Sequence, residues 1–230
     1  YGFSPGNIEL FLTKVDLQLL ENDDVKLKDA RIELTNKILE IFATKNLGNI
    51  NDLNNQIEIS DVADRITNML FRKNDTILTL NYDCYLENIL FNKAKWSQLG
   101  GWGEIFSFPE DTVNKNKYLN IEIFKLHGSI NFILVAPLDN DGFNFNREKL
   151  MLKWEVNDDI FPGWHESNTW TETVKEYIVL PSYLKQFEYK DILELWRNAA
   201  FRIQEADKLV IIGTSLREED YPLKFLASLI

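Results

Sequence analysis

The first seventy residues place apolar side chains with the period of an amphipathic helix. Apolar positions recur at i, i+3, i+4 and i+7 over residues 8–19, after a candidate cap at Asn7. The same period returns over about residues 23–44 and 60–71, on either side of a break rich in Gly and Asn. We therefore expect three helices that form a helical layer over residues 1–72.

From residue 75 the pattern changes to short, continuous apolar runs that favour β-strands. Four such runs lie at residues 76–80, 121–126, 176–180 and 208–212, and helical patterns lie at 85–91, at 191–206 and from about 220. Such runs alternating with helices are typical of a parallel sheet covered on both faces. The pattern predicts an α/β fold: a Rossmann-like parallel sheet flanked by helices, with the helical N-terminal layer beside it. Residues 137–175 fit neither period, and we expect an irregular insertion or lid there.

Composition limits the classes of function. The net charge is −11 and no run of Lys or Arg occurs, which disfavours binding to nucleic acid or to an anionic membrane. The single cysteine, Cys84, allows neither an internal disulfide nor a four-thiolate zinc site, and it favours a reducing, cytoplasmic setting. No apolar run is long enough for a transmembrane helix. We expect residues 1–230 to be one domain cut from a longer chain, because the first residues resemble the middle of a loop.

The ends of the predicted strands carry most of the candidate chemistry. Ligands of an open parallel sheet bind beyond the carboxyl ends of its strands. The first, second and fourth runs end in Asn81-Tyr82-Asp83, His127-Gly128-Ser129 and Gly213-Thr214-Ser215. His127 is suited to acid–base work because the unperturbed pKa of histidine lies near neutrality. Each segment also has a structural interpretation: a turn that caps a helix, a core histidine, and an ordinary strand-to-helix turn.

Other nucleotide-binding and hydrolase motifs are missing from the sequence. It contains no G-x-G-x-x-G, no G-x-x-x-x-G-K-[ST] and no G-x-S-x-G, and no cluster of His, Cys, Asp or Glu has metal-ligand spacing. Gly100-Gly101-Trp102-Gly103 follows no clear strand, and its interpretation as a phosphate loop or a structural turn stays open. These absences leave the strand ends as the main candidate site.

Three segments resemble motifs of the sirtuin family. Thr79-Leu80-Asn81-Tyr82-Asp83 resembles the motif T-x-N-x-D, and Lys125-Leu126-His127-Gly128-Ser129 resembles the catalytic H-G-S turn. The segment from Leu209 to Leu216 resembles the late strand and the G-[ST]-S-L turn that hold the dinucleotide. The segments at residues 7–12 and 181–185 look like the bacterial sirtuin-like branch found in antiphage defence proteins. The resemblance covers most of the chain, apart from the expected insertion.

Two departures narrow what this resemblance implies. Sirtuin deacylases carry a zinc ribbon with two C-x-x-C pairs, which a chain with one cysteine does not have. The departure points to the zinc-free branch, whose members typically hydrolyse NAD. The family's G-A-G-x-S turn, which cradles the pyrophosphate, is also missing, and we expect it just before Tyr1.

The resemblance implies an NAD glycohydrolase that acts in antiphage defence by depleting NAD. It would cleave the nicotinamide–ribose bond to give nicotinamide and ADP-ribose, without zinc. His127 would be the catalytic base, Asn81 would orient the ribose and the attacking water, and Asp83 would help position the nicotinamide carboxamide. The expected NAD-binding residues are Asn81, Asp83, Gly128, Ser129, Gly213, Thr214 and Ser215, with Gly213 and Ser215 on the adenosine side.

Partners and two alternative functions complete the expectations. By analogy with the family branch, we expect a homo-oligomer and a fused or associated sensor domain or phage-derived trigger. One alternative is an NAD-dependent transferase that passes ADP-ribose or an acyl group to a protein. The other is a nucleotide-sensing or assembly domain that kept the fold without turnover.

Overall fold

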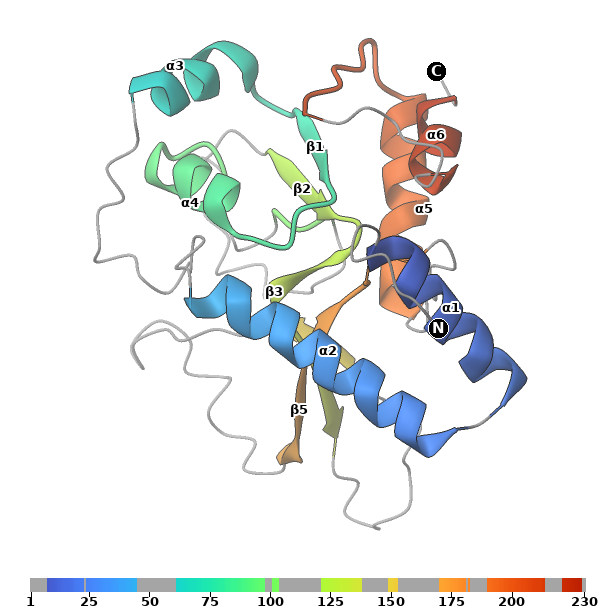
Figure 1. Ribbon diagram of the computed structural model, residues 1–230. Helices are drawn as coiled ribbons and strands as arrows, with labels where there is room; N and C mark the ends of the chain where they lie inside the picture. Colours follow the sequence, from blue (N-terminus) through green and yellow to red (C-terminus); the bar gives the residue numbers. More distant parts are fainter. Residues whose placement is uncertain are drawn as a thin grey trace. The chain divides into compact units, whose positions relative to one another are not determined.

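The computed structural model divides into two compact units. One unit combines Tyr1–Ile38 with Val179–Ile230, and the other is Leu39–Ile178. The described residues form six helices and five strands, which Figure 1 colours along the chain. The described residues are 8–22, 24–44, 61–97, 101–103, 121–137, 149–152, 170–180, 182, 190–213 and 221–228.

The unit that combines the two ends of the chain is mainly helical in its described residues. It contains α1 (Ile8–Glu21), most of α2 (Val25–Thr44), α5 (Lys190–Gln204) and α6 (Tyr221–Ala227). Asp24 caps α2, because its Oδ1 accepts the backbone amides of the first turn at 2.9 and 3.3 Å. The helices expected from the periodicity of these segments are confirmed.

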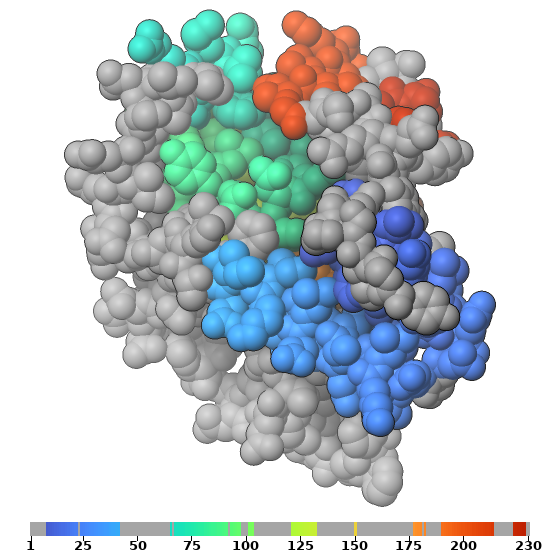
Figure 2. All heavy atoms as spheres, in the orientation of Figure 1, coloured from blue at the N-terminus to red at the C-terminus, as the bar shows by residue number. Residues whose placement is uncertain are grey.

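Buried contacts hold the helices of this unit. Arg31 Nε on α2 donates to Asp16 Oδ1 on α1 at 2.6 Å, and the Asp16 side chain is buried. The Thr13 and Ser182 hydroxyl oxygens lie 3.3 Å apart. Most other described side chains of α2 are exposed, and Figure 2 shows this helix on the molecular surface. The apolar stripe that α5 buries consists of Ile192, Leu195, Trp196, Ala199 and Ile203, at the helical spacing that the sequence predicts.

The other unit begins with a helix, a strand and a second helix. These are α3 (Asp61–Leu70), β1 (Thr76–Thr79) and α4 (Tyr85–Asn92). Lys95 Nζ donates to the Thr67 carbonyl at 2.7 Å and thereby satisfies one of the last carbonyls of α3. The three elements match the sequence expectation, with ends that differ by one or two residues.

A parallel strand pair and an antiparallel sheet follow one another in this unit. Strand β2 (Glu122–Lys125) pairs in parallel with β1, and Thr79 lies opposite Lys125 at the carboxyl ends. After a turn at residues 126–127 the chain enters β3 (Gly128–Pro137). Strand β3 lies between β4 (Lys149–Leu152) and β5 (Trp170–Ile178), antiparallel to both. The described residues therefore form a mixed α/β structure with a two-stranded parallel sheet.

The third apolar run and the expected insertion differ from the prediction. Residues 176–178 end β5, which is antiparallel to β3 and does not extend the parallel sheet. Strand β4 and most of β5 lie in the span 137–175, so its described part is not irregular. The sequence Trp-Thr-Glu-Thr-Val-Lys-Glu-Tyr-Ile of β5 carries polar residues throughout, which suits an antiparallel strand better than a fully buried parallel one.

The second and fourth apolar runs also differ in part. Gly128 and Ser129, expected in a turn, instead begin β3. Residues 208–212 form no strand, and the side chains from Leu209 to Ile212 are 36–65 % exposed. A strand requires a hydrogen-bonded neighbour, and no described strand pairs with this segment. Apolar character alone therefore did not suffice for strand formation at this position.

Aromatic side chains form the centre of the strand-containing unit. The rings of Trp96 and Trp102 meet edge to face with centroids 4.9 Å apart, and Trp102 meets Phe132 at 5.7 Å. The Gly101 carbonyl accepts both Trp96 Nε1 and the Ile123 backbone amide at 2.8 Å. The described part of the glycine-rich segment is thus packed into the core beside β2, which supports its interpretation as a structural turn.

Candidate functional site

The parallel pairing of β1 and β2 brings two of the sequence motifs to one edge. The carboxyl ends of both strands point the same way, so Asn81-Tyr82-Asp83 and the His127 turn follow neighbouring strands. The rings of Tyr82 and His127 lie 6.5 Å apart between centroids, tilted by 36°. The structure therefore places the T-L-N-Y-D and K-L-H-G-S segments side by side, as the parallel-sheet prediction requires.

Donor groups of residues 125–130 bind carbonyl oxygens at the end of β1 and in the loop that follows it. Leu126 N donates to Thr79 O at 3.0 Å, and Ile130 N donates to Tyr82 O at 3.0 Å. Ser129 Oγ donates to the same Tyr82 oxygen at 3.1 Å, and Lys125 Nζ donates to the Asp83 backbone oxygen. We call these four hydrogen bonds to Thr79, Tyr82 and Asp83 the carbonyl clamp. They fix the loop carrying Asn81 and Asp83 to the segment that carries His127.

The three predicted catalytic residues have different environments. His127 is buried, with 6 % of its surface exposed, whereas Asn81 is exposed and Asp83 is half-buried. The backbone amide of Asn81 donates to Thr79 Oγ1 at 3.2 Å. Its side chain takes no part in this bond and lies at the surface. Asp83 Oδ1 accepts the Tyr85 amide at 3.0 Å and so supports the start of α4. One carboxylate oxygen of Asp83 therefore has the structural role at the start of α4 that the sequence offered as an alternative.

Gly128 and Ser129 are committed to contacts within the protein. Gly128 has φ +77°, and a Cβ there would lie 2.6 Å from the Tyr177 carbonyl oxygen of β5. A glycine is needed at this position by the close approach of β5 and by the left-handed backbone. Ser129 is fully buried, and its Oγ also lies 3.6 Å from Cys84 Sγ. Contact of either residue with NAD stays a prediction.

A buried ion pair lies behind the loop. Lys125 Nζ is 2.8 Å from Glu87 Oε1 on α4, and the two side chains are 1 % and 0 % exposed. No further hydrogen bond from the described residues reaches either Glu87 oxygen. Burial by itself lowers the pKa of Lys125, but the Glu87 carboxylate, with smaller contributions from Cys84 and Asp83, raises the pKa above the ordinary lysine value. Lys125 is therefore charged at neutral pH.

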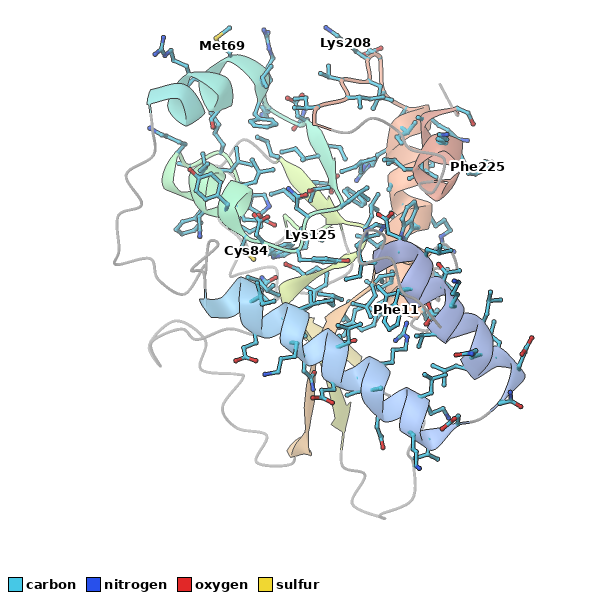
Figure 3. The ribbon with its side chains drawn as sticks, in the orientation of Figure 1. Phe11, Met69, Cys84, Lys125, Lys208 and Phe225 are labelled. Atoms are coloured by element: carbon cyan, nitrogen blue, oxygen red, sulfur yellow. The ribbon has the colours of Figure 1, made fainter. Side chains whose placement is uncertain are left out.

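The neighbours of this pair are held in their neutral forms. Burial raises the pKa of the Cys84 thiol to about 12, and the nearby Glu87 charge acts in the same direction. Burial also raises the pKa of the Tyr82 phenol well above its usual range. Figure 3 labels Cys84 and Lys125, which lie near each other. Neither the thiol nor the phenol can supply an anion near neutral pH.

Lys125 and Glu87 are not among the site residues predicted from the sequence. Lys125 had a visible signal, because it is the one charged residue in the apolar run Ile123 to Leu126. A charge in a buried strand requires a partner of opposite sign. Glu87 had no such signal, because an acidic residue in the first turn of a short helix is common on exposed surfaces.

Of the three residues predicted after the fourth apolar run, the structure describes only Gly213. Gly213 belongs to the other compact unit, is exposed, and has φ +71° with no atom within 4 Å of a Cβ placed there. Thr214 and Ser215 lie outside the described residues. The positive φ of Gly213 agrees with a turn at this point, and its role in binding NAD stays a prediction.

Searches for metal sites, membrane helices and relatives give three findings. Within the described ranges, no group of three or more His, Cys, Asp or Glu side chains could hold a metal ion. None of the described helices combines the length and apolar character needed to cross a membrane. No protein-family model and no curated protein matches the sequence.

Proposed function

We propose that this chain is a sirtuin-like NAD glycohydrolase domain, with NAD as its substrate and no zinc. The observation that supports this proposal is the parallel pairing of β1 and β2, which joins the T-L-N-Y-D loop to the His127 turn through the carbonyl clamp. An imidazole, an amide and a carboxylate thus come from one sheet edge. These are the three groups that the sirtuin resemblance requires for work on the nicotinamide ribose.

The chemistry of the reaction fits these groups. Cleavage of the nicotinamide–ribose bond passes through an oxocarbenium-like state, as in glycoside hydrolysis. Nicotinamide leaves as a neutral molecule, so no strong acid is needed to protonate it. His127 takes the proton from the attacking water or a ribose hydroxyl, and Asn81 orients that nucleophile. The Asp83 carboxylate positions the carboxamide through the oxygen that is not used by the Tyr85 amide.

Binding of the dinucleotide requires more of the chain. In this proposal Gly213 and Ser215 contact the adenosine side of NAD, as the sirtuin resemblance implies. A chain with net charge −11 binds an anionic pyrophosphate through backbone amides rather than through a basic patch. NAD depletion in the cytoplasm, activated in a homo-oligomer by a sensor domain or phage-derived trigger, is the corresponding biological role.

The test is release of nicotinamide and ADP-ribose from NAD by the full-length protein, with its trigger where one is needed. Substitution His127→Ala removes the proposed base and should lower the rate 10²–10⁴-fold. Asn81→Ala should also lower the rate, without loss of the folded state, because its side chain is exposed. His165→Ala, the same substitution at the only other histidine, is the control and should leave the rate unchanged. Undiminished release by the His127 and Asn81 variants would refute the proposal.

The same assay separates the alternative classes. A transferase would attach label from NAD to a protein acceptor instead of releasing free ADP-ribose. A sensing or assembly domain would bind NAD in calorimetry and release no nicotinamide even in the activated state. Either result would replace hydrolysis as the function of this site.

A further inference from the structure

The loop that carries Asn81 and Asp83 is hydrogen-bonded to the segment that carries His127. Its hydrogen bonds include those from the Asn81 backbone amide to Thr79 Oγ1 and from the Tyr85 backbone amide to Asp83 Oδ1, together with the carbonyl clamp. Two clamp bonds use backbone amides, and one uses a serine hydroxyl that already lies beside Tyr82. The fourth comes from the long side chain of Lys125, which reaches the last carbonyl of the loop.

We propose that Lys125 is a positioning residue that holds the Asn81–Asp83 loop at the distance from His127 that NAD cleavage requires. This inference rests on the proposed function and deepens it. Lys125 lies opposite Thr79 in the β1–β2 register, where the loop begins, and its Nζ reaches the Asp83 carbonyl, where the loop ends. One side chain therefore fixes the separation of the two ends of the loop.

Glu87 is needed for the positioning role of Lys125, because burying the Lys125 charge without a partner would be costly. A fully buried ion pair stabilises a protein no better than a well-packed apolar pair of similar volume. The Lys125–Glu87 pair is fully buried. What it provides beyond an apolar pair is a fixed direction for the Lys125 ammonium group. Glu87 keeps Lys125 charged and oriented, and the charged ammonium donates to the Asp83 carbonyl as well. Substitution of both residues removes the hydrogen bond to the Asp83 carbonyl without leaving one buried charge unpaired.

The experiment compares two double variants of the full-length protein. Lys125→Met with Glu87→Gln removes the clamp donor and both charges. Asp16→Asn with Arg31→Met removes another ion pair whose carboxylate is buried, within the helical unit, and serves as the control. For each protein we measure kcat and KM for nicotinamide release per folded molecule, with the folded fraction taken from circular dichroism. Amide exchange at Ile130, whose acceptor is Tyr82 O, reports the position of the loop.

A positioning role predicts a split between the kinetic constants. A misplacement of about 1 Å in a catalytic group can lower a rate about 100-fold. The Lys125/Glu87 double variant should lose about 10–100-fold in kcat per folded molecule, with KM within about threefold of the natural value. Exchange at Ile130 should rise at least about tenfold, whereas the Asp16/Arg31 double variant should leave kcat and this exchange unchanged.

Each outcome decides one of the two proposals. A kcat per folded molecule within about twofold of the natural protein, or unchanged exchange at Ile130, overturns the positioning role. A rise in KM at constant kcat also overturns it, because Lys125 would then act on binding. No nicotinamide release by the activated natural protein, together with faster exchange at Ile130, supports the clamp and overturns the proposed function.

Discussion

Removal of Lys125 alone should destabilise the protein far more than removal of both partners of its ion pair. The substitution Lys125→Met leaves the Glu87 carboxylate at 0 % exposure with no cation, and no other described group donates to its oxygens. Loss of one partner of a buried pair costs about 3–5 kcal/mol. Further substitution Glu87→Gln removes the uncompensated charge and should recover more than half of that loss.

The surface of α5 provides a control pair with the same N–O distance. Arg197 and Glu194 form a pair at 2.8 Å, the same N–O distance as the buried pair, but their side chains are 74 % and 40 % exposed. Exposed pairs contribute about 0.2–1 kcal/mol, so Arg197→Met should change the free energy of unfolding by less than about 1 kcal/mol. Burial, rather than the N–O distance, therefore accounts for the larger loss of stability expected for Lys125→Met than for Arg197→Met.

Urea unfolding followed by tryptophan fluorescence measures these differences at pH 7. With a slope of about 3 kcal/mol per molar urea, a loss of 3–5 kcal/mol moves the midpoint by about 1 M or more. A midpoint for Lys125→Met within 0.3 M of the natural one would refute the reasoning, and so would a double variant as unstable as the single one.

The pH dependence of this pair has a definite sign. The pKa of Lys125 is raised in the folded protein above its ordinary value of 10.5. The stability that the pair adds is therefore complete below about pH 10.5 and is lost as the pH rises through the folded pKa. The difference in stability between the natural protein and the Lys125/Glu87 double variant should therefore change with pH only in this alkaline range.

Three further predictions concern the surroundings of the site. Gly101→Ala should cost about 1–3 kcal/mol in urea unfolding, because its Cβ would lie 2.1 Å from Trp96 Nε1 and 2.5 Å from the Ser97 carbonyl oxygen; unchanged stability would contradict this packing. Cys84, with its pKa raised from 9.0 to about 12, should resist alkylation in the folded protein at pH 8 and react after unfolding in urea. The same shift predicts that stability falls by about 1.4 kcal/mol per pH unit between pH 9 and 12, a slope that Cys84→Ser should reduce by that amount.

The local elements of this fold could be predicted because their signals are local. The stripe on α5 and the runs that became β1 and β2 each contain their own period or apolar core. Strand pairing is not local, and there the prediction was wrong for β5, which pairs with β3 in the opposite direction. Residues 208–212 show the same limit, since their apolar character says nothing about an available strand edge.

In the candidate site, the motif residues could be predicted from the sequence, but the residues that hold them in place could not. His127, Asn81 and Asp83 could be chosen from sequence because each stands at the end of a predicted strand and matches a family motif. Lys125 and Glu87 could not be paired in this way, because α4 and β2 are far apart in sequence and meet only through folding. The residues that carry chemistry were thus easier to find than the residues that hold them in place.

His127 stands where two sheets of opposite kind meet, and this position restrains it from both sides. Leu126 binds Thr79 on the parallel side, and Gly128 lies opposite Ile178 on the antiparallel side. The backbone turns between these contacts through the positive φ of Gly128, in a space that β5 leaves only for a glycine. A side chain between two anchored neighbours on regular elements has a better-defined position than one on a free loop. Among the described residues no second sheet pairs with the loop of Asn81 and Asp83, and the carbonyl clamp supplies the corresponding restraint.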